Sequence, residues 1–528
     1  MSLFKKRPVA PWWRGAFLYQ IYPRSFHDSN GDGIGDLPGI TEKLDYIASL
    51  GVDGVWISPF FKSPMKDFGY DVSDYRDVDP IFGTLEDFDL LLKKAHDLNL
   101  KIIIDLVLNH TADQHPWFLE SRKDKTNPKA DWYVWADKIP NNWVSVFGGP
   151  AWTFDETRGQ YYFHNFLKEQ PDLNFHNPDV RQAALDIARF WLDKGVDGFR
   201  LDVVNFYFHD ALLRDNPPRT YGAHYATQLE SPDPYSEQQH VYDKSRPENL
   251  EFIKSFRALM DQYPDRFTVG EIGDDNPNER AAEYTASGLL DTCYNTSMMS
   301  GAHKDLTEDL IREPIEEFLN HRGHWPSWAF SNHDVVRAAS RWHTPGDGFS
   351  HDPRLSKMLI ALLGSLYGTA FLYQGEELGL PESRLKFEDL KDPWGIALYP
   401  KWQGRDGCRT PMPWHTTPPA KSWLPMPEDH NKMSVAIQEK DPASTLNFMR
   451  RFLAWRKTQS ALCTDGEIKF IDMGDAKIIA FKRGTEETKI VTCFFNLSDK
   501  ENSCDGSLMA PYGFSFFSGG EEVFSSSS

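Results

Sequence analysis

The chain has 528 residues, a length that predicts either several domains or one large barrel with additions. Apolar residues make up 40% of the sequence and aromatic residues 14%, which is enough for a large core and excludes wholesale disorder. Lysine and arginine total 57 against 77 aspartates and glutamates, and the net charge of −20 argues against nucleic acid and anionic membranes as partners.

The cysteines, the N-terminus and the longest uncharged run predict a soluble cytoplasmic protein. A monomer or a weak homo-oligomer is expected. None of the five cysteines forms a CxxC pair, so neither a zinc site nor a disulfide framework is expected. The basic residues at 5–7 are followed by PVAPWWRG, which is not the apolar stretch of a secretory signal. The uncharged run 358–375 is interrupted by glycines at 364 and 368, so we interpret it as a buried helix, a turn and a buried strand.

Short apolar runs recur along the chain and predict buried strands at 16–23, 51–59, 101–109, 195–203, 267–272, 292–299, 327–334 and 369–377. They are continuous rather than alternating, as strands covered on both faces should be, although 292–299 is the least apolar. Helical periodicity occurs at 38–50, 84–99, 179–195, 249–264, 305–322, 354–368 and 443–460. Eight strands with interleaved helices indicate a closed (β/α)8 barrel, and a doubly wound open sheet is the alternative because spacing cannot prove closure.

Two regions depart from this repeat. Residues 111–174 have little periodicity, are rich in aromatic side chains and are too long for a loop, so we expect a small inserted domain. From about residue 463 the runs are short and alternating, as in KIIAFKRG and KIVTCFFNLS, which predicts a C-terminal antiparallel β domain over 463–528. The catalytic barrel is then expected to span 1–110 and 175–462.

The stretch DSNGDGIGD at 28–36 has the spacing that begins a calcium-binding loop. Its ligands would be Asp28, Asn30, Asp32, the carbonyl of Ile34, and Asp36, with Gly33 at the turn. The twelfth position is Gly39 instead of a bidentate glutamate, and no entering helix precedes the loop, so a calcium sensor is not expected. A turn without an ion is one alternative. We predict a lone structural ion, Ca²⁺ or alternatively Mg²⁺, that offsets repulsion among the carboxylates.

Acidic residues stand at the ends of four of the predicted strands, where an unpaired charge would be costly. Strand three holds Asp105 and strand four Asp202, strand five ends in Glu271, and strand seven ends in Asp334. Separate structural salt bridges are one explanation. Metal binding lacks an HExxH pattern or a close histidine pair, and a serine or cysteine nucleophile lacks a GxSxG-like elbow. Carboxylates near an aromatic-rich cleft favour acid chemistry on sugars, because glycoside hydrolysis uses paired acids.

The ordered motifs DLVLNH, QPDLNF, GFRLDVVN, VGEIG and SNHD resemble those of the alpha-amylase family of glycoside hydrolases, family 13. QIYPRSF, FGYDVSDY, YQGEELG and GRDGCRTPMPW resemble its bacterial alpha-glucosidase and oligo-1,6-glucosidase branch. The resemblance runs from about residue 12 into the C-terminal region. It implies the same (β/α)8 barrel, with an inserted domain after strand three and a C-terminal β domain.

The resemblance also implies a role for each site residue. Asp202 would be the nucleophile and Glu271 the acid and then the base, while Asp334 would bind sugar hydroxyls and favour a distorted ring. Arg200 would hold Asp202 ionised. The remaining roles would be hydroxyl binding by His110 and His333, stacking by Tyr70 and Phe166, and an ion pair of Asp71 with Arg409 that closes the far end of the pocket.

These roles agree with simple physical chemistry. A retaining mechanism needs carboxyls about 5–5.5 Å apart, which adjacent strand ends can supply. Arg200 should lower the pKa of Asp202, whereas neighbouring acids should raise that of Glu271. A closed pocket admits only a chain end, so exo attack on short alpha-gluco-oligosaccharides is expected. No organic cofactor is expected.

Val203 follows the nucleophile, and in this family valine there tends to accompany α-1,6 preference, while threonine or alanine accompanies α-1,4. We therefore expect a preference for isomaltose-type linkages, with an ordinary strand-end residue as the alternative. An α-1,4-preferring glucosidase, a transglucosylase or sucrose isomerase, and a non-catalytic barrel relative are the competing functions. The last is disfavoured because the chain has all three acids.

Overall fold

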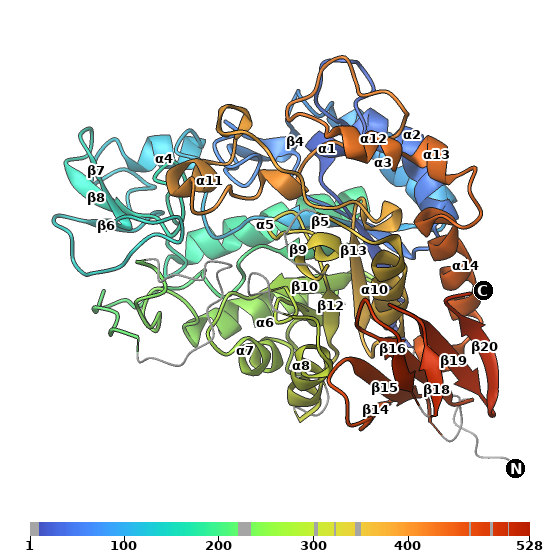
Figure 1. Ribbon diagram of the computed structural model, residues 1–528. Helices are drawn as coiled ribbons and strands as arrows, with labels where there is room; N and C mark the ends of the chain where they lie inside the picture. The colour runs from blue at the N-terminus through green and yellow to red at the C-terminus, as the bar shows by residue number, and fades with distance from the viewer. Residues whose placement is uncertain are drawn as a thin grey trace, which may run out of the picture.

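A computed structural model of the chain describes residues 10–219, 234–299, 305–320, 324–343, 350–463, 466–485, 489–504 and 506–527. Eight of the described strands are parallel and form a closed barrel in the order β1-β13-β12-β11-β10-β9-β5-β2 (Figure 1). They are β1 (Phe17–Ile21), β2 (Gly54–Ile57), β5 (Lys101–Leu106), β9 (Gly198–Leu201), β10 (Phe267–Glu271), β11 (Thr292–Asn295), β12 (Ser327–Ala329) and β13 (Thr369–Tyr373). Each lies in one of the predicted apolar runs, so the prediction of a closed barrel is confirmed.

Helices follow most of the barrel strands and cover them from outside. The long ones are α2 (Leu37–Ser49), α3 (Leu85–Asp97), α5 (Pro178–Lys194), α6 (Glu248–Met260), α7 (Pro277–Tyr284), α8 (Glu308–Asn320), α10 (Pro353–Ser365) and α14 (Thr445–Lys457). Short helical turns are α1 (Pro23–Phe26), α9 (Ala338–Arg341), α11 (Pro393–Leu398), α12 (Glu428–Lys432), α13 (Val435–Gln438), α15 (Ser460–Cys463), η1 (Glu376–Leu378), η2 (Phe387–Asp389) and η3 (Asp406–Cys408). The periodicity had predicted every long helix except α7, whose eight residues give little period.

Local sequence explains where these helices begin and end. In α3, the side chain of Thr84 accepts from the amide of Asp87, and the carboxylate of Asp87 accepts from the amide of Thr84, which is a capping box. In α5, Asn177 caps the first turn before Pro178, and Gly195 ends the helix at φ +102°, a conformation that glycine adopts without strain.

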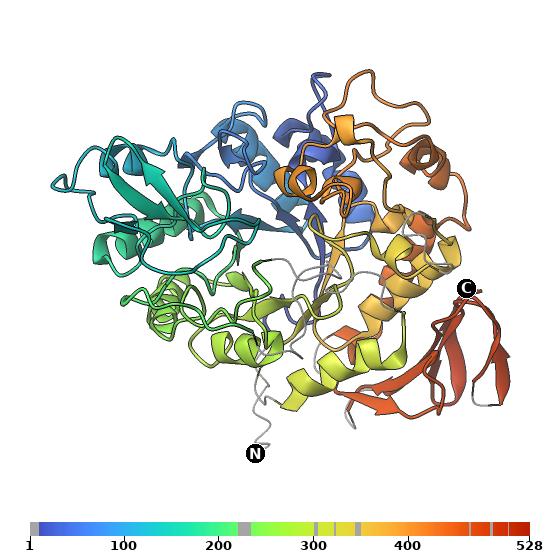
Figure 2. The ribbon, with the colours of Figure 1, turned by 60° about the vertical axis from the view of Figure 1, so that its left-hand side comes forward.

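A small sheet lies between β5 and α5, in the part of the chain where the aromatic residues gather. Its strands are β6 (Trp135–Ala136), β7 (Trp152–Asp155) and β8 (Gln160–Phe163), which pair antiparallel in the order β6-β8-β7 after the short helix α4 (Pro116–Ser121). A two-stranded ribbon of β3 (Phe61–Lys62) and β4 (Asp74–Val78) precedes it in the chain. Figures 1 and 2 both place the small sheet on the side of the barrel away from the C-terminal sheet.

The C-terminal part is an antiparallel sheet of order β14-β15-β16-β19-β20, with a separate ribbon β17-β18. Its strands are β14 (Ile468–Ile471), β15 (Ile478–Arg483), β16 (Val491–Asn496), β17 (Asn502–Cys504), β18 (Ser507–Met509), β19 (Phe514–Ser518) and β20 (Glu521–Ser525). Phe452 and Trp455 of α14 pack against Phe516 of β19, with the two ring centroids 6.0 and 4.9 Å from that of Phe516. Aromatic packing therefore fastens this sheet to the barrel helices.

The uncharged run 358–375 forms the end of α10, a turn and β13, as predicted. In the described part of the chain, no helix combines the length and the apolar character that a membrane crossing requires.

Candidate active site

Arg200 brings the predicted nucleophile and acid together at the carboxyl ends of neighbouring strands. Asp202 directly follows β9, Glu271 ends β10, and these two strands pair in parallel. One terminal nitrogen of Arg200 contacts both Asp202 and Asp105, the latter at 2.9 Å, and the other terminal nitrogen lies 2.6 Å from Glu271 Oε2. Because one buried guanidinium contacts both Asp202 and Glu271, the two carboxyls face the same space.

Burial and the single arginine set the charge of this acid pair. Burial raises the pKa of Glu271 to about 7, opposed by Arg200 and reinforced by the charges of Asp202 and Asp334. Burial also raises the pKa of Asp202 to about 7, with Arg200 again opposing. The charge of Asp202 raises the pKa of Glu271, which favours the protonated form of this acid. A carboxylate beside a carboxylic acid is what a retaining glycosidase requires.

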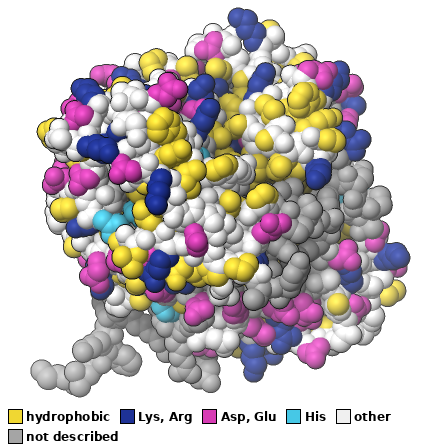
Figure 3. All heavy atoms as spheres, turned by 90° about the vertical axis from the view of Figure 1, so that its left-hand side faces the viewer, with side chains coloured by type: hydrophobic (Ala, Val, Ile, Leu, Met, Phe, Trp, Pro, Cys, Tyr) yellow, Lys and Arg dark blue, Asp and Glu magenta, His cyan; other side chains and the backbone are white. Residues whose placement is uncertain are grey.

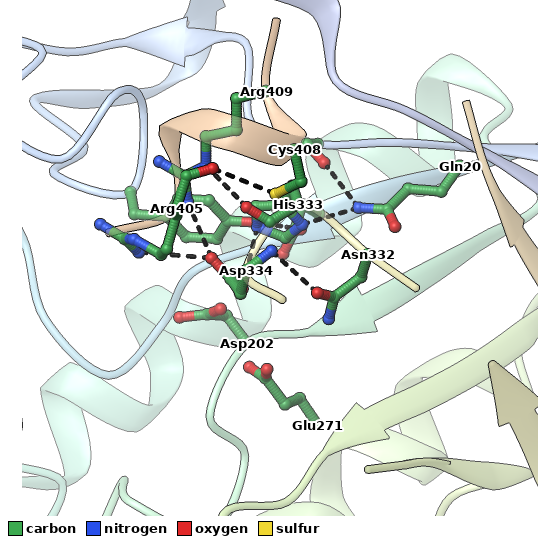
Figure 4. A network of polar contacts seen from close by, with 12 residues as sticks. Gln20, Asp202, Glu271, Asn332, His333, Asp334, Arg405, Cys408 and Arg409 are labelled. Carbon is green, nitrogen blue, oxygen red and sulfur yellow. Dashed lines mark hydrogen bonds and ion pairs between the residues drawn. The ribbon is translucent and has the colours of Figure 1, made fainter. Parts of the chain in front are cut away.

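Asp334 lies above this pair and is held ionised (Figure 4). Burial alone would raise its pKa, but the neighbouring charges of Arg405 and Arg409 lower it below the usual range. Its Oδ1 lies 2.8 Å from Arg409 and 3.3 Å from Arg405. In Figure 4 the side chains of Asp202 and Glu271 lie just below Asp334, so three carboxyl groups, at the end of β10 and after β9 and β12, gather at one place.

The predicted histidines lie beside this space and are neutral. Burial lowers the pKa of His110 to about 4 and that of His333 to about 3. His333 Nε2 lies 2.7 Å from the hydroxyl of Tyr70, and the rings of the two residues are stacked at 5.4 Å. His110 packs against Phe166 with ring centroids 5.2 Å apart. A neutral imidazole can donate to or accept from a sugar hydroxyl without bringing a charge.

The predicted ion pair between Asp71 and Arg409 is wrong. Asp71 is fully buried, and its carboxylate accepts hydrogen bonds from the amides of Lys66 and Asp67 and from the hydroxyl of Ser63, so it braces a turn. Arg409 instead pairs with Asp334 and donates to the carbonyl of His333 at 2.6 Å. Two backbone amides already satisfy the carboxylate of Asp71, so it is stabilised without an ion pair to Arg409.

The ion pair near the far end of the site involves residues that sequence reasoning had overlooked. Arg405 lies 2.8 Å from Asp67 and 2.8 Å from Asp392, in addition to its contact with Asp334. Arg405 stands four residues before Arg409 in GRDGCRTPMPW, and Asp67 stands four residues before Asp71. The right motifs had therefore been noticed, but within each motif the wrong charged residue was chosen.

Val203 has an unusual backbone for a β-branched residue. Its φ is +37°, a region that costs such side chains about 1–3 kcal/mol and that is most often found at functional sites. The strained turn points the amide of Val203 toward Glu271 Oε2 at 3.2 Å, and the next amide donates to the carbonyl of Glu271 at 2.9 Å. Val203 thus links the nucleophile turn to the catalytic acid.

A cavity of about 210 Å³ opens over these groups. Four of the predicted site residues line it, Phe166, Val203, Glu271 and Asp334. Sequence reasoning missed other lining residues: Phe206, Tyr235, Lys244, Trp394 and Trp402. Trp394 lies in the short helix α11, and the other four stand outside helices and strands. Only the aromatic character of four of the five could have drawn attention to them, and Lys244 has no such signal. Figure 3 looks onto the side of the small sheet, where hydrophobic side chains gather across the middle of the face.

The loop predicted to hold an ion uses many of its oxygens within its own backbone. Asp28 accepts from the amides of Gly31 and Gly33 at 2.7 and 2.8 Å, Asn30 accepts from Asp32, and Asp32 accepts from Ile34. Asp36 caps α2 through the amide of Gly39 at 2.6 Å. In the described residues, no group of three or more His, Cys, Asp or Glu side chains is arranged to hold a metal. The other oxygens retain lone pairs that suit a hard cation, so the ion stays a prediction.

A closed parallel barrel with paired carboxyls at its carboxyl edge is the arrangement of a barrel glycosidase. A family model described as alpha amylase, catalytic domain, matches residues 20–465. The chain belongs to the alpha-amylase family.

Three known proteins are similar to this chain over nearly its whole length. It is 54% identical over 508 residues to a probable alpha-glucosidase of Rhizobium meliloti (strain 1021), covering 93% of this chain and 90% of that protein. It is 38% identical over 527 residues to an oligo-1,6-glucosidase of Parageobacillus thermoglucosidasius, covering 92% and 90%. The crystal structure of the alpha-glucosyl transfer enzyme XgtA matches with a TM-score of 0.92 at 49% identity, covering 97% of this chain and 100% of that one.

Proposed function

We propose that the protein is an exo-acting, retaining alpha-glucosidase that releases glucose from the non-reducing end of short alpha-glucosides. The observation that carries this proposal is that Arg200 contacts Asp202 and Glu271 at once, beneath an ionised Asp334. The similarity to an alpha-glucosidase and to an oligo-1,6-glucosidase supports the same activity.

The geometry suits a two-step displacement. Asp202 attacks the anomeric carbon while Glu271 gives its proton to the leaving oxygen, so a covalent glucosyl-enzyme forms and the remainder of the substrate departs as an alcohol. Glu271, now ionised, takes a proton from water, whose oxygen attacks the same carbon and frees Asp202. Arg200 balances the negative charge of Asp202 whenever the covalent bond is broken.

The charged network around Asp334 supports exo attack. Buried Arg405 pairs with two buried carboxylates, Asp67 and Asp392, and Arg409 adds a second cation on Asp334. These paired charges can hydrogen-bond to the hydroxyls of a terminal sugar, and they close the end of the pocket through which a longer chain would have to continue. Short alpha-gluco-oligosaccharides are therefore the proposed substrates.

The linkage preference rests on Val203, which adjoins the nucleophile and touches Glu271 through its amide. We propose a preference for α-1,6 over α-1,4 linkages, since valine lacks the hydroxyl that threonine would offer to a leaving sugar. Glucosyl transfer is the second candidate, favoured by the 49% identity to an alpha-glucosyl transfer enzyme. It uses the same covalent intermediate, and a sugar hydroxyl replaces water in the second step.

A panel of glucosyl disaccharides tests these proposals. The parent protein should release glucose from isomaltose with a higher kcat/KM than from maltose, and Asp202→Asn should abolish release from both. Product analysis at high sugar concentration separates the two candidates, because transfer yields longer oligosaccharides at the expense of free glucose. Glucose release by Asp202→Asn at the parent rate would refute the assignment of the nucleophile.

The remaining proposals concern the state of the protein. The five cysteines, all in the described part of the chain, are free thiols, which supports a cytoplasmic location because reducing compartments keep thiols unpaired. We also propose a monomer or weak homo-oligomer, and a structural Ca²⁺ or Mg²⁺ ion in the Asp28 loop.

A further inference from the structure

Lys244 is a buried cation at the cavity whose charge no ion pair in the described residues accounts for. Its side chain is only 5% exposed, and it lines the same cavity as Glu271. Among the described residues its Nζ makes one hydrogen bond, to the hydroxyl of Tyr235 at 2.9 Å. Burial lowers the pKa of Lys244, because it is unfavourable to keep a cation out of water.

The acids near Lys244 are engaged by other groups. Asp243 pairs with His240 at 2.5 Å, Asp275 pairs with Arg219, and Asp274 accepts from Ser245 and pairs with Arg280 at 3.3 Å. An ammonium has three donors, of which Tyr235 uses one. The ammonium of Lys244 therefore has N–H donors left, and because buried donors need acceptors, an oxygen of a bound molecule would satisfy them.

Two neighbouring contacts place Lys244 on the leaving-group side of the site. The hydroxyl of Ser245 donates to Asp274 at 2.6 Å, and Asn205 joins Ser245 to the carbonyl of Gly273. Gly273 and Asp274 lie two and three residues after the catalytic acid, Glu271. Since Glu271 protonates the oxygen that leaves, a group held against this loop faces the departing sugar and not the glucose held by Asp334.

Aromatic rings give this region the character of a sugar subsite. Lys244 Nζ lies 4.9 Å from the ring centroid of Phe206 and 5.1 Å from that of Tyr235. Phe206 in turn stacks on Phe166 with ring centroids 5.8 Å apart. An apolar ring face beside a polar donor matches a sugar, whose C–H face is apolar and whose rim bears hydroxyls.

We propose that Lys244, with Phe206 and Tyr235, forms the subsite for the sugar on the leaving side of the cleaved bond. Lys244 donates hydrogen bonds to hydroxyl oxygens of that sugar, and in glucosyl transfer it binds the accepting sugar in the same way. Lys244 is a specificity-determining residue that favours leaving groups with a hydroxyl-bearing ring over aryl leaving groups. This inference rests on the proposed function.

The test compares a disaccharide with an aryl α-glucoside that has no hydroxyls on its leaving group. Lys244→Met keeps the aliphatic stem against Phe206 and removes the donors. We expect kcat/KM for isomaltose to fall by about 10- to 100-fold, the value of a hydrogen bond from a charged group, while kcat/KM for p-nitrophenyl α-glucoside stays at the parent value. The matched control is Lys254→Met, because Lys254 is exposed on α6 and pairs with Glu251 on the same helix.

Two readouts distinguish a subsite from a structural role. The aryl substrate reports folding and chemistry, and its pH profile should be unchanged in Lys244→Met because the groups that shift the pKa of Glu271 are burial, Arg200, Asp202, Asp334 and the amide of Val203. Equal losses on both substrates, or no loss on either, would overturn the subsite. A parent that hydrolyses neither substrate would instead refute the proposed function, and the subsite with it.

Discussion

Replacement of Arg405 by methionine should destabilise the protein and damage the glucose-binding end of the cavity together. The guanidinium is 6% exposed and lies 2.8 Å from both Asp67 and Asp392 and 3.3 Å from Asp334. Against the effect of burial, Arg405 lowers the pKa of Asp392 to about 2. Arg405→Met therefore leaves three ionised or ionisable carboxylates without the cation that they share.

The magnitude follows from burial. Because Arg405, Asp67 and Asp392 are all shielded from solvent, no screening discount applies, and the loss of one partner of such a network costs about 3–5 kcal/mol. Removal of a second charge, in Arg405→Met/Asp392→Asn, should recover about 1–3 kcal/mol of this loss through the coupling of contacting residues. The kcat/KM for isomaltose should stay low in both variants, because Asp334 has lost a partner in each.

Urea unfolding, followed by tryptophan fluorescence, measures the stability of the parent, of the single variants Arg405→Met and Asp392→Asn, and of the double variant. The exposed pair of Lys125 and Asp137 provides a control, since Lys125→Met should leave the unfolding midpoint unchanged. If the two single losses simply add in the double variant, the network is not coupled and the reasoning fails. Parent activity in Arg405→Met would likewise contradict the role given to the network.

Three further predictions concern the acid, the linkage and the ion. Because Glu271 must be protonated and its pKa is raised to about 7, kcat/KM should fall as the pH rises above about 7, and Glu271→Gln, which has no proton to give, should have little activity at any pH. Val203→Thr should shift the kcat/KM ratio of isomaltose to maltose toward maltose, and an unchanged ratio would refute the linkage assignment. Calcium should raise the thermal unfolding midpoint of the parent but not of Asp28→Ala, and equal midpoints with calcium and with a chelator would refute the ion.

The barrel could be predicted from the sequence because each of its strands is buried on both faces. In the run KIIIDL, Lys101 at the start is partly exposed, and Asp105, the one buried polar residue, is the one that Arg200 contacts. The sheet closes through β1 and β13, which are 348 residues apart between Ile21 and Thr369, and no local pattern encodes that pairing. Closure therefore had to be inferred from the number of strands.

The acids could be predicted because a charge at the end of a buried strand destabilises the fold unless another group pairs with it, so several such charges indicate a functional site. The partners of those acids could not be predicted in the same way. Asp71 and Asp67 are four residues apart in one turn, and only the fold shows that Asp71 faces backbone amides while Asp67 faces Arg405. Lys244 lies in a polar loop where its burial has no sequence signature.

The central claim, that Asp202 attacks the anomeric carbon, is tested most directly by trapping the covalent intermediate. In Glu271→Gln, α-glucosyl fluoride should still react with Asp202, since fluoride leaves without a proton, but water can no longer be activated to release the sugar. Intact-protein mass spectrometry should then show one added glucosyl residue, and peptide mapping should locate it on Asp202. A glucosyl residue on any other side chain, or β-glucose as the first product of the parent protein, would contradict the account.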